Sequence, residues 1–170
     1  MSFSLVPDHS FRNLLDISPD FLSRHGIKFL MIDLDNTIAA YNELFPSSTQ
    51  KNWIQDIKNS GVEMFLISNS SRTNRVESFA KALDLGFILN ASKPSPRSVY
   101  KAMDTAGYNT CESALAGDQI FTDTLAANRA GVVSVIVRPR RFTNIFLALR
   151  YYIEIPVRVM CKNKNQGIRK

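Results

Sequence analysis

The sequence predicts an α/β fold in which a parallel sheet of about five strands lies between two layers of helices. Apolar runs of strand length alternate with segments of helical periodicity over residues 28–137, the order that produces parallel sheets. These runs are apolar throughout, as is typical of strands that are buried on both faces. The 170 residues suffice for one domain with a continuous core.

The first 27 residues are predicted to form a helical leader that packs on this core. Turn signals at residues 6–8 and 17–20 each precede an apolar-periodic segment. Ser18 or Asp20 can cap the second of these segments, with Pro19 in its first turn. We therefore expect two short helices before the first strand.

Strands and helices then alternate along the core, which we place at residues 28–160. The strands are expected within 28–38 and at 62–67, 86–89, 113–116 and 132–137. The helices between them are expected at 49–60, 72–83, 95–106 and 122–130. Right-handed crossovers would place these helices on both faces of the sheet.

The C-terminal part of the chain allows two interpretations. Apolar residues recur at helical spacing over 142–160, and Pro156 is expected to interrupt a helix there. The segment either covers the sheet edge as part of the core or contacts a membrane. Residues 161–170 are polar and basic, and are expected to be a disordered tail.

The net charge of +6 is concentrated in this C-terminal part. From Arg138 onward the chain has nine Lys or Arg residues and one acidic residue, a net charge of +8, whereas the first 137 residues carry −2. Such a segment suggests an anionic partner, for example a lipid surface, a nucleic acid or a phosphorylated substrate. A solvated tail that only aids solubility is the alternative interpretation.

The compartment is predicted from the cysteines and from the N-terminus. Cys111 and Cys161 lie far apart without accompanying histidine or cysteine, which favours a reducing compartment and argues against a zinc site. We find neither a signal-peptide pattern nor an apolar run long enough to span a membrane. A cytoplasmic protein is expected, with peripheral contact at the inner membrane face as one option.

Polar side chains follow four of the five predicted strands at the point where each strand ends. They are Asp33, Asp35, Ser68, Asn69, Lys93, Asp118 and Asp123. The carboxyl ends of parallel strands meet at one edge of the sheet, where α/β proteins build their sites. Asp33 and Asp35 are two residues apart and face the same way on an extended chain. Such a pair of like charges needs a cation or a shared proton.

These residue types suit phosphoryl transfer in a definite division of roles. Asp33 can attack phosphorus as a nucleophile and form an aspartyl-phosphate. Asp35 can then act as general acid and base for the leaving group and the attacking water. Mg²⁺ prefers oxygen ligands, which Asp33, the main-chain carbonyl of Asp35 and the carboxylate of Asp118 would supply.

The remaining polar groups are expected to bind the phosphate. Ser68 and the amides around Asn69 can donate hydrogen bonds to phosphoryl oxygens, and Lys93 provides a fixed positive charge. Asp123 would orient either Lys93 or a metal-bound water.

In order and placement, these residues resemble the four motifs of the haloacid dehalogenase-like phosphatases. The matching strings are Asp33-Leu-Asp-Asn-Thr37, Ser68-Asn69, Lys93-Pro94 and Gly117-Asp118-Gln-Ile-Phe-Thr-Asp123. Together with the leader strings Leu14-Leu-Asp-Ile-Ser-Pro19 and Gly26-Ile-Lys28, they resemble the YqeG-like family of subfamily IIIA. The resemblance implies a three-layer Rossmann-like fold and a Mg²⁺-dependent phosphatase. Relatives of this branch include phosphatidylglycerophosphate phosphatases, which makes that phospholipid the first candidate substrate.

The spacing of the motifs leaves no room for a cap domain. Only residues 38–48 separate the first motif from the next helix, and residues 70–92 hold one helix and one strand. An uncapped site suits a phosphate on a large or surface-bound substrate, although an oligomer could supply a lid. A nucleotide or nucleic-acid-end phosphatase, or a non-catalytic regulatory or scaffold domain with this fold, remains the alternative.

Overall fold

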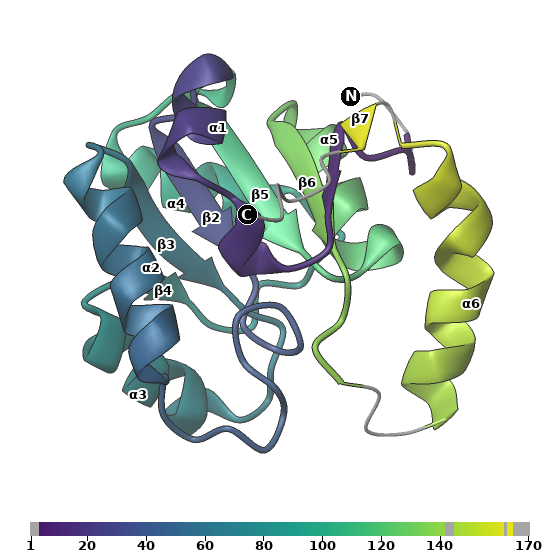
Figure 1. Cartoon of the computed structure of the whole chain (residues 1–170), viewed down its shortest axis with the longest axis horizontal. Helices are drawn as coiled ribbons and strands as arrows, with labels where there is room; N and C mark the ends of the chain where they lie inside the picture. The colour runs from purple at the N-terminus through teal and green to yellow at the C-terminus, as the bar shows by residue number, and fades with distance from the viewer. Residues whose placement is uncertain (1–3, 142–144, 162, 165–170) are drawn as a thin grey trace.

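A computed structural model describes residues 4–141, 145–161 and 163–164, and it contains a seven-stranded sheet in the order β4-β3-β2-β5-β6-β1-β7 (Figure 1). Neighbouring strands pair in parallel throughout the described sheet. The strands are β1 (His9–Phe11), β2 (Phe29–Ile32), β3 (Glu63–Ile67), β4 (Gly86–Ile88), β5 (Ser113–Gly117), β6 (Val133–Val137) and β7 (Asn163–Lys164).

Helices cover both faces of this sheet. They are α1 (Pro19–Arg24), α2 (Ser48–Asn59), α3 (Thr73–Leu83), α4 (Arg97–Ala106), α5 (Leu125–Ala130) and α6 (Ile145–Val159). Short 3-10 turns occur at Leu14–Asp16 and Thr110–Glu112, and a π-helical turn at Ile120–Thr124 precedes α5. Figure 1 shows α2 and α3 in front of the sheet, whereas α6 stands at its far end, next to β7.

Two apolar clusters, one on each face, follow from the alternation of side chains along the strands. In β2, Leu30 and Ile32 pack against α1, α2 and α3, whereas Phe29 and Met31 pack against α4 and α5. All four side chains are fully buried. The predicted parallel sheet between two helical layers is therefore confirmed, with two short strands more than the five expected.

The N-terminal segment differs from the two helices predicted for it. Residues His9–Phe11 form β1, which pairs in parallel with β6. The main chain of an unpaired β6 would expose its donors and acceptors, and β1 satisfies them. The second predicted helix is present as α1, where Ser18 accepts a hydrogen bond from the Phe21 amide.

The C-terminal segment also departs from the prediction. Pro156 lies inside α6, near its C-terminal end, instead of interrupting the helix. Proline there removes the hydrogen bond to the carbonyl oxygen of Tyr152, and only three residues of the helix follow it. Of the predicted tail, Asn163–Lys164 pair with β1 as β7, and residues 162 and 165–170 lie outside the described residues. Within the described ranges, every helix is too short or too polar to cross a membrane.

Candidate active site

The site lies where the sheet changes its direction of growth. From β2 the chain builds β3 and β4 on one side, and it then returns to build β5 and β6 on the other. Crevices at the carboxyl ends of strands beside such a point are the usual ligand sites of α/β sheets. Asp33 and Asp35 directly follow β2, and Asp118 follows β5. The structure thus brings the predicted acidic residues to one edge.

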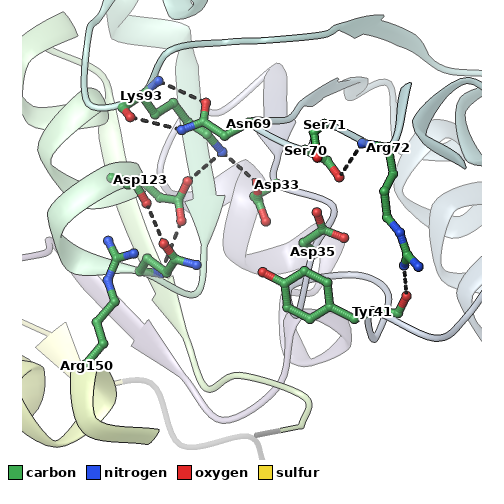
Figure 2. A pocket seen from close by; sticks show the side chains of 12 residues that line it. Asp33, Asp35, Tyr41, Asn69, Ser70, Ser71, Arg72, Lys93, Asp123 and Arg150 are labelled. Carbon is green, nitrogen blue, oxygen red and sulfur yellow. Dashed lines mark hydrogen bonds and ion pairs between the residues drawn. The ribbon is translucent and has the colours of Figure 1, made fainter. Parts of the chain in front are cut away.

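Lys93 connects two of these carboxylates. Its Nζ lies 2.6 Å from Asp33 Oδ1 and 2.6 Å from Asp123 Oδ1, and it donates a hydrogen bond of 2.9 Å to the carbonyl oxygen of Ile67 (Figure 2). The Lys93 side chain is only 1% exposed. Burial disfavours its charged form, but Asp123 and Asp33 outweigh this effect and raise the pKa of Lys93. Lys93 is therefore a fixed cation beside Asp33.

Three carboxylates form a buried cluster that suits a divalent cation. Oxygen atoms of Asp33, Asp118 and Asp123 lie within 4.8 Å of one another. Burial raises the pKa of Asp33 to about 7 against the opposing charge of Lys93, and burial also raises the pKa of Asp118 well above its usual value. Hard oxygen donors grouped with an excess of negative charge are what Mg²⁺ requires. The residues present therefore fit a bound Mg²⁺.

Asp123 differs from the other two carboxylates in its protein contacts. One oxygen pairs with Lys93, and the other accepts a hydrogen bond of 3.1 Å from the Gln119 amide. Because both of its carboxylate oxygens have protein partners, Asp123 is placed to orient Lys93. Asp33 and Asp118 are the two members of the cluster left to bind the ion. A Cβ atom added at Gly117 would lie 2.2 Å from Asp123 Cγ. Glycine at the end of β5 is therefore required for this arrangement.

The turn after β2 directs Asp35 toward the same pocket. Asn36 adopts a φ of 61°, a left-handed conformation that asparagine tolerates better than most residues. Its amide donates to the carbonyl oxygen of Ala39 at 2.7 Å, which closes the turn. Thr37 Oγ1 lies 3.4 Å from Asp118 Oδ1. The turn thereby links the first and the last of the sequence motifs.

The predicted phosphate-binding residues divide into two groups. Asn69 lines the pocket, and its side chain bonds the main chain of Lys93 in both directions at 3.0 Å. Ser68 is fully buried, and its hydroxyl accepts the Ser70 amide at 3.0 Å. The hydroxyl-bearing side chains that line the pocket directly after β3 are those of Ser70 and Ser71. The phosphate-binding role of Ser68 and Asn69 stays a prediction.

Comparison with known proteins identifies the family. The model of the haloacid dehalogenase-like hydrolases matches residues 8–131, which is most of the chain. The chain belongs to this family. It is 27% identical over 164 residues to the probable phosphatase YqeG of Bacillus subtilis (strain 168), covering 95% of this chain and 93% of that protein. The predicted relation to YqeG-like phosphatases is confirmed.

Solved structures with the same fold include two phosphatases. A cobalt-bound deoxy-D-mannose-octulosonate 8-phosphate phosphatase from Haemophilus influenzae is similar at a TM-score of 0.54 and 15% identity, covering 89% of this chain and 80% of that one. The 3-deoxy-D-manno-octulosonate 8-phosphate phosphatase of Moraxella catarrhalis, in complex with magnesium and phosphate ions, is similar at a TM-score of 0.54 and 20% identity. The match covers 84% of this chain and 80% of that one. An uncharacterized protein from Listeria monocytogenes serotype 4b has a TM-score of 0.55 at 13% identity, and the match covers 72% of this chain and 97% of that one.

Arg75 is a residue of this hydrolase site that the sequence analysis did not single out. From α3, its Nη1 lies 2.5 Å from Asp35 Oδ1. Its other nitrogens donate to the carbonyl oxygens of Glu43 and Ala40, each at 2.7 Å. Arg75 is itself buried. The sequence did offer a signal for Arg75, since its position falls on the buried side of α3 together with Val76 and Phe79.

The pocket mouth carries further residues that sequence reasoning missed. The pocket has a volume of about 400 Å³, and Tyr41, Arg72 and Arg150 line it beside the acidic residues. Burial and nearby acidic groups raise the pKa of Tyr41 to about 12, so its hydroxyl remains a hydrogen-bond donor. Arg150 comes from α6, far from the motifs in sequence. Two guanidinium groups therefore line the pocket in addition to the buried Lys93. Arg72 also donates to the carbonyl oxygen of Tyr41 at 2.7 Å, and Arg150 Nε lies 3.5 Å from Glu154 Oε1.

Proposed function

We propose that this hydrolase is a Mg²⁺-dependent phosphomonoesterase that works through an aspartyl-phosphate on Asp33. The observation that carries the proposal is the position of Asp33, which faces a polar pocket, is held by Lys93 and lies in a carboxylate cluster with Asp118. Nucleophile, fixed cation and metal ligands are thus grouped at one point. These are the elements that phosphoryl transfer needs.

The reaction divides into two displacements. In the first, an oxygen of Asp33 bonds to phosphorus, the bond to the ester oxygen breaks, and Asp35 gives that oxygen a proton. In the second, Asp35 takes a proton from water, whose oxygen bonds to phosphorus and releases Asp33 and inorganic phosphate. Arg75 holds Asp35 Oδ1, which leaves Oδ2 as the atom for proton transfer.

Mg²⁺ would be held by the carboxylates of Asp33 and Asp118 and the main-chain carbonyl of Asp35. When bound, it would neutralise the negative charge of the phosphoryl group and the cluster. Lys93 contributes a second, permanent positive charge next to Asp33. Ser68, Asn69 and the adjacent amides would donate to the phosphoryl oxygens.

The first candidate substrate is phosphatidylglycerophosphate, and the pocket mouth supports it. This lipid carries a phosphomonoester and, a glycerol away, a phosphodiester. Arg72 and Arg150 line the mouth around the catalytic residues, and guanidinium groups are well suited to bind phosphate. The chain inserts no cap domain between the elements that bear the motifs, and the site is therefore accessible to a headgroup. We accordingly propose that the protein belongs to subfamily IIIA and is cytoplasmic, with peripheral contact at the inner membrane face.

A substrate comparison tests this assignment. Phosphate release from phosphatidylglycerophosphate in mixed micelles is measured beside nucleoside monophosphates, 5′-phosphorylated oligonucleotides and sugar phosphates, with and without Mg²⁺. We expect kcat/KM to be highest for the lipid. A clear preference for nucleotides or nucleic-acid ends would replace the lipid with the second candidate class. Absence of turnover on every substrate would instead favour a non-catalytic regulatory or scaffold domain.

A further inference from the structure

Helix α6 presents its apolar side to solvent. The most exposed apolar residues of α6, together with Met160 directly after it, fall at positions 145, 149, 152, 153, 159 and 160, a spacing of three, four and seven that marks one face of a helix. We call this face the α6 stripe, and its members are between 57% and 78% exposed: Ile145, Leu149, Tyr152, Ile153, Val159 and Met160. An exposed apolar face of this length indicates a surface that something covers.

Two charged residues on the opposite side of α6, Glu154 and Arg158, fix the helix to the core. Glu154 is buried, accepts a hydrogen bond of 3.0 Å from the Ile120 amide, and pairs with Arg158 at 2.8 Å. Arg158 donates to the carbonyl oxygens of Val137, at 3.0 Å, and of Asp118. The described contacts therefore attach α6 through charges. The two interpretations of this segment, cover of the sheet edge and contact with a membrane, stay predictions.

We propose that the α6 stripe docks on an anionic lipid surface. Amphipathic helices that lie in a membrane interface combine an exposed apolar face with neighbouring basic residues. The chain supplies the second feature, because residues 138–170 carry a net charge of +8. Arg138 and Arg141, directly before α6, are exposed. Juxtamembrane basic residues are attracted to anionic headgroups in this way.

The same charge argues against a second copy of the chain as the occupant. A two-fold symmetric contact would place the stripe of one copy against the stripe of the other. It would also leave the net charge of residues 138–170, +8 in each copy, without an anionic partner. An anionic surface both buries the stripe and neutralises these charges.

Docking through α6 would hold against the lipid surface the helix that contributes Arg150 to the pocket. Arg150 lies on the same helix and lines the pocket, and Figure 2 shows it extending from α6 toward the group around Asp123. The same helix would thus contact the surface through its stripe and the pocket through Arg150. In this respect the inference rests on the proposed function and deepens it, since it describes how the enzyme meets a lipid substrate.

A vesicle-binding experiment tests the inference without any substrate. The whole protein is sedimented with vesicles of phosphatidylcholine alone and with vesicles that also contain phosphatidylglycerol. The main variant is Leu149→Ser with Ile153→Ser, which removes two exposed side chains from the stripe. Gln55→Ser with Asn59→Ser is the matched control, since it changes two exposed side chains at the same spacing on α2. A second stripe variant, Val159→Ser with Met160→Ser, serves if the first fails to fold.

We expect the wild type to bind only the vesicles with phosphatidylglycerol. The stripe variant should bind at least about tenfold more weakly, and the control should stay within about twofold of the wild type. Unchanged binding of a folded stripe variant, or no binding by the wild type, overturns the inference. A wild-type dimer that the stripe variant converts to a monomer assigns the stripe to a second copy and likewise overturns it.

A parallel assay separates this result from failure of the proposed function. Turnover of a soluble aryl phosphate should be the same in the wild type and in the stripe variant, because the exposed Leu149 and Ile153 take no part in the site. Vesicle binding without any turnover would reject the phosphatase and keep the docking surface. Turnover without vesicle binding would reject the docking surface and keep the phosphatase.

Discussion

The edge of the sheet that carries the candidate active site, here called the catalytic edge, and helix α6 both differ from the usual pattern of buried apolar and exposed charged side chains. They differ from it in opposite ways. At the edge, charged side chains such as Lys93 and Asp123 are almost fully buried, whereas α6 exposes large apolar side chains such as Ile145 and Leu149. Buried charges are tolerated only with partners, and the partners of Lys93 are present in the chain. The described residues offer no comparable cover for the α6 stripe. In the two proposals, a small ion and a substrate complete the first region and a lipid surface completes the second.

Removal of the metal should have a large effect on the catalytic edge. Because Asp33, Asp118 and Asp123 form a buried cluster, we expect a chelator to abolish phosphate release and added Mg²⁺ to restore it. The thermal unfolding midpoint should rise with Mg²⁺ concentration, since the ion binds only the folded cluster. Turnover that is insensitive to a chelator would contradict the metal assignment.

The buried ion pair of Asp35 offers the next test. Arg75→Met would leave Asp35 without the cation that lies 2.5 Å away, and we expect a loss of roughly 3–5 kcal/mol in the free energy of unfolding. Urea denaturation measures the loss. The double variant Arg75→Met with Asp35→Asn should recover part of it, because the uncompensated charge is gone. A stable Arg75→Met protein with wild-type kcat would reject the positioning role.

Gly117→Ala tests how closely the edge is packed. The new methyl group would lie 2.2 Å from Asp123 Cγ, so Asp123 must move and Lys93 loses its orientation. We expect a destabilisation of about 1–3 kcal/mol and a kcat that falls more than KM changes. Thermal unfolding and steady-state kinetics measure the two effects. Unchanged values for both would show that the contact between β5 and Asp123 is unimportant.

Arg150 joins the two regions, and its replacement should have a smaller and more selective effect. Arg150→Gln is expected to lower kcat/KM about tenfold for phosphatidylglycerophosphate, as for the loss of one hydrogen bond to a charged group. The loss should be smaller for an aryl phosphate, which has a single anionic group. Arg24→Gln, on the exposed surface of α1, is the matched control. Equal losses on both substrates would reject a second anionic group as the ligand of Arg150.

Sequence reasoning reached the residues whose position follows from a strand. Asp33, Lys93 and Asp118 come directly or shortly after predicted strands, and the parallel sheet brings such positions to one edge. Arg75 and Arg150 lie on helices, and their reach into the site depends on how each helix packs. Periodicity cannot supply that information.

The errors in the fold have a related cause. The three-residue strand β1 depends on pairing with β6 more than on its own pattern. For α6, the spacing of apolar residues defined a face correctly, but a pattern does not say whether that face points to the core or to solvent. Contacts between Glu154, Ile120 and Arg158 decide its direction, and they are tertiary.

The central claim is tested most directly by trapping the intermediate on Asp33. The enzyme is mixed with excess substrate and Mg²⁺ and quenched in acid within one turnover, and its peptides are examined by mass spectrometry. Asp35→Asn is included because it should slow hydrolysis of the intermediate. We predict one phosphoryl group on the peptide that contains Asp33, and no adduct or turnover in Asp33→Asn. Wild-type turnover in Asp33→Asn, or a phosphoryl group on another residue, would contradict the mechanism.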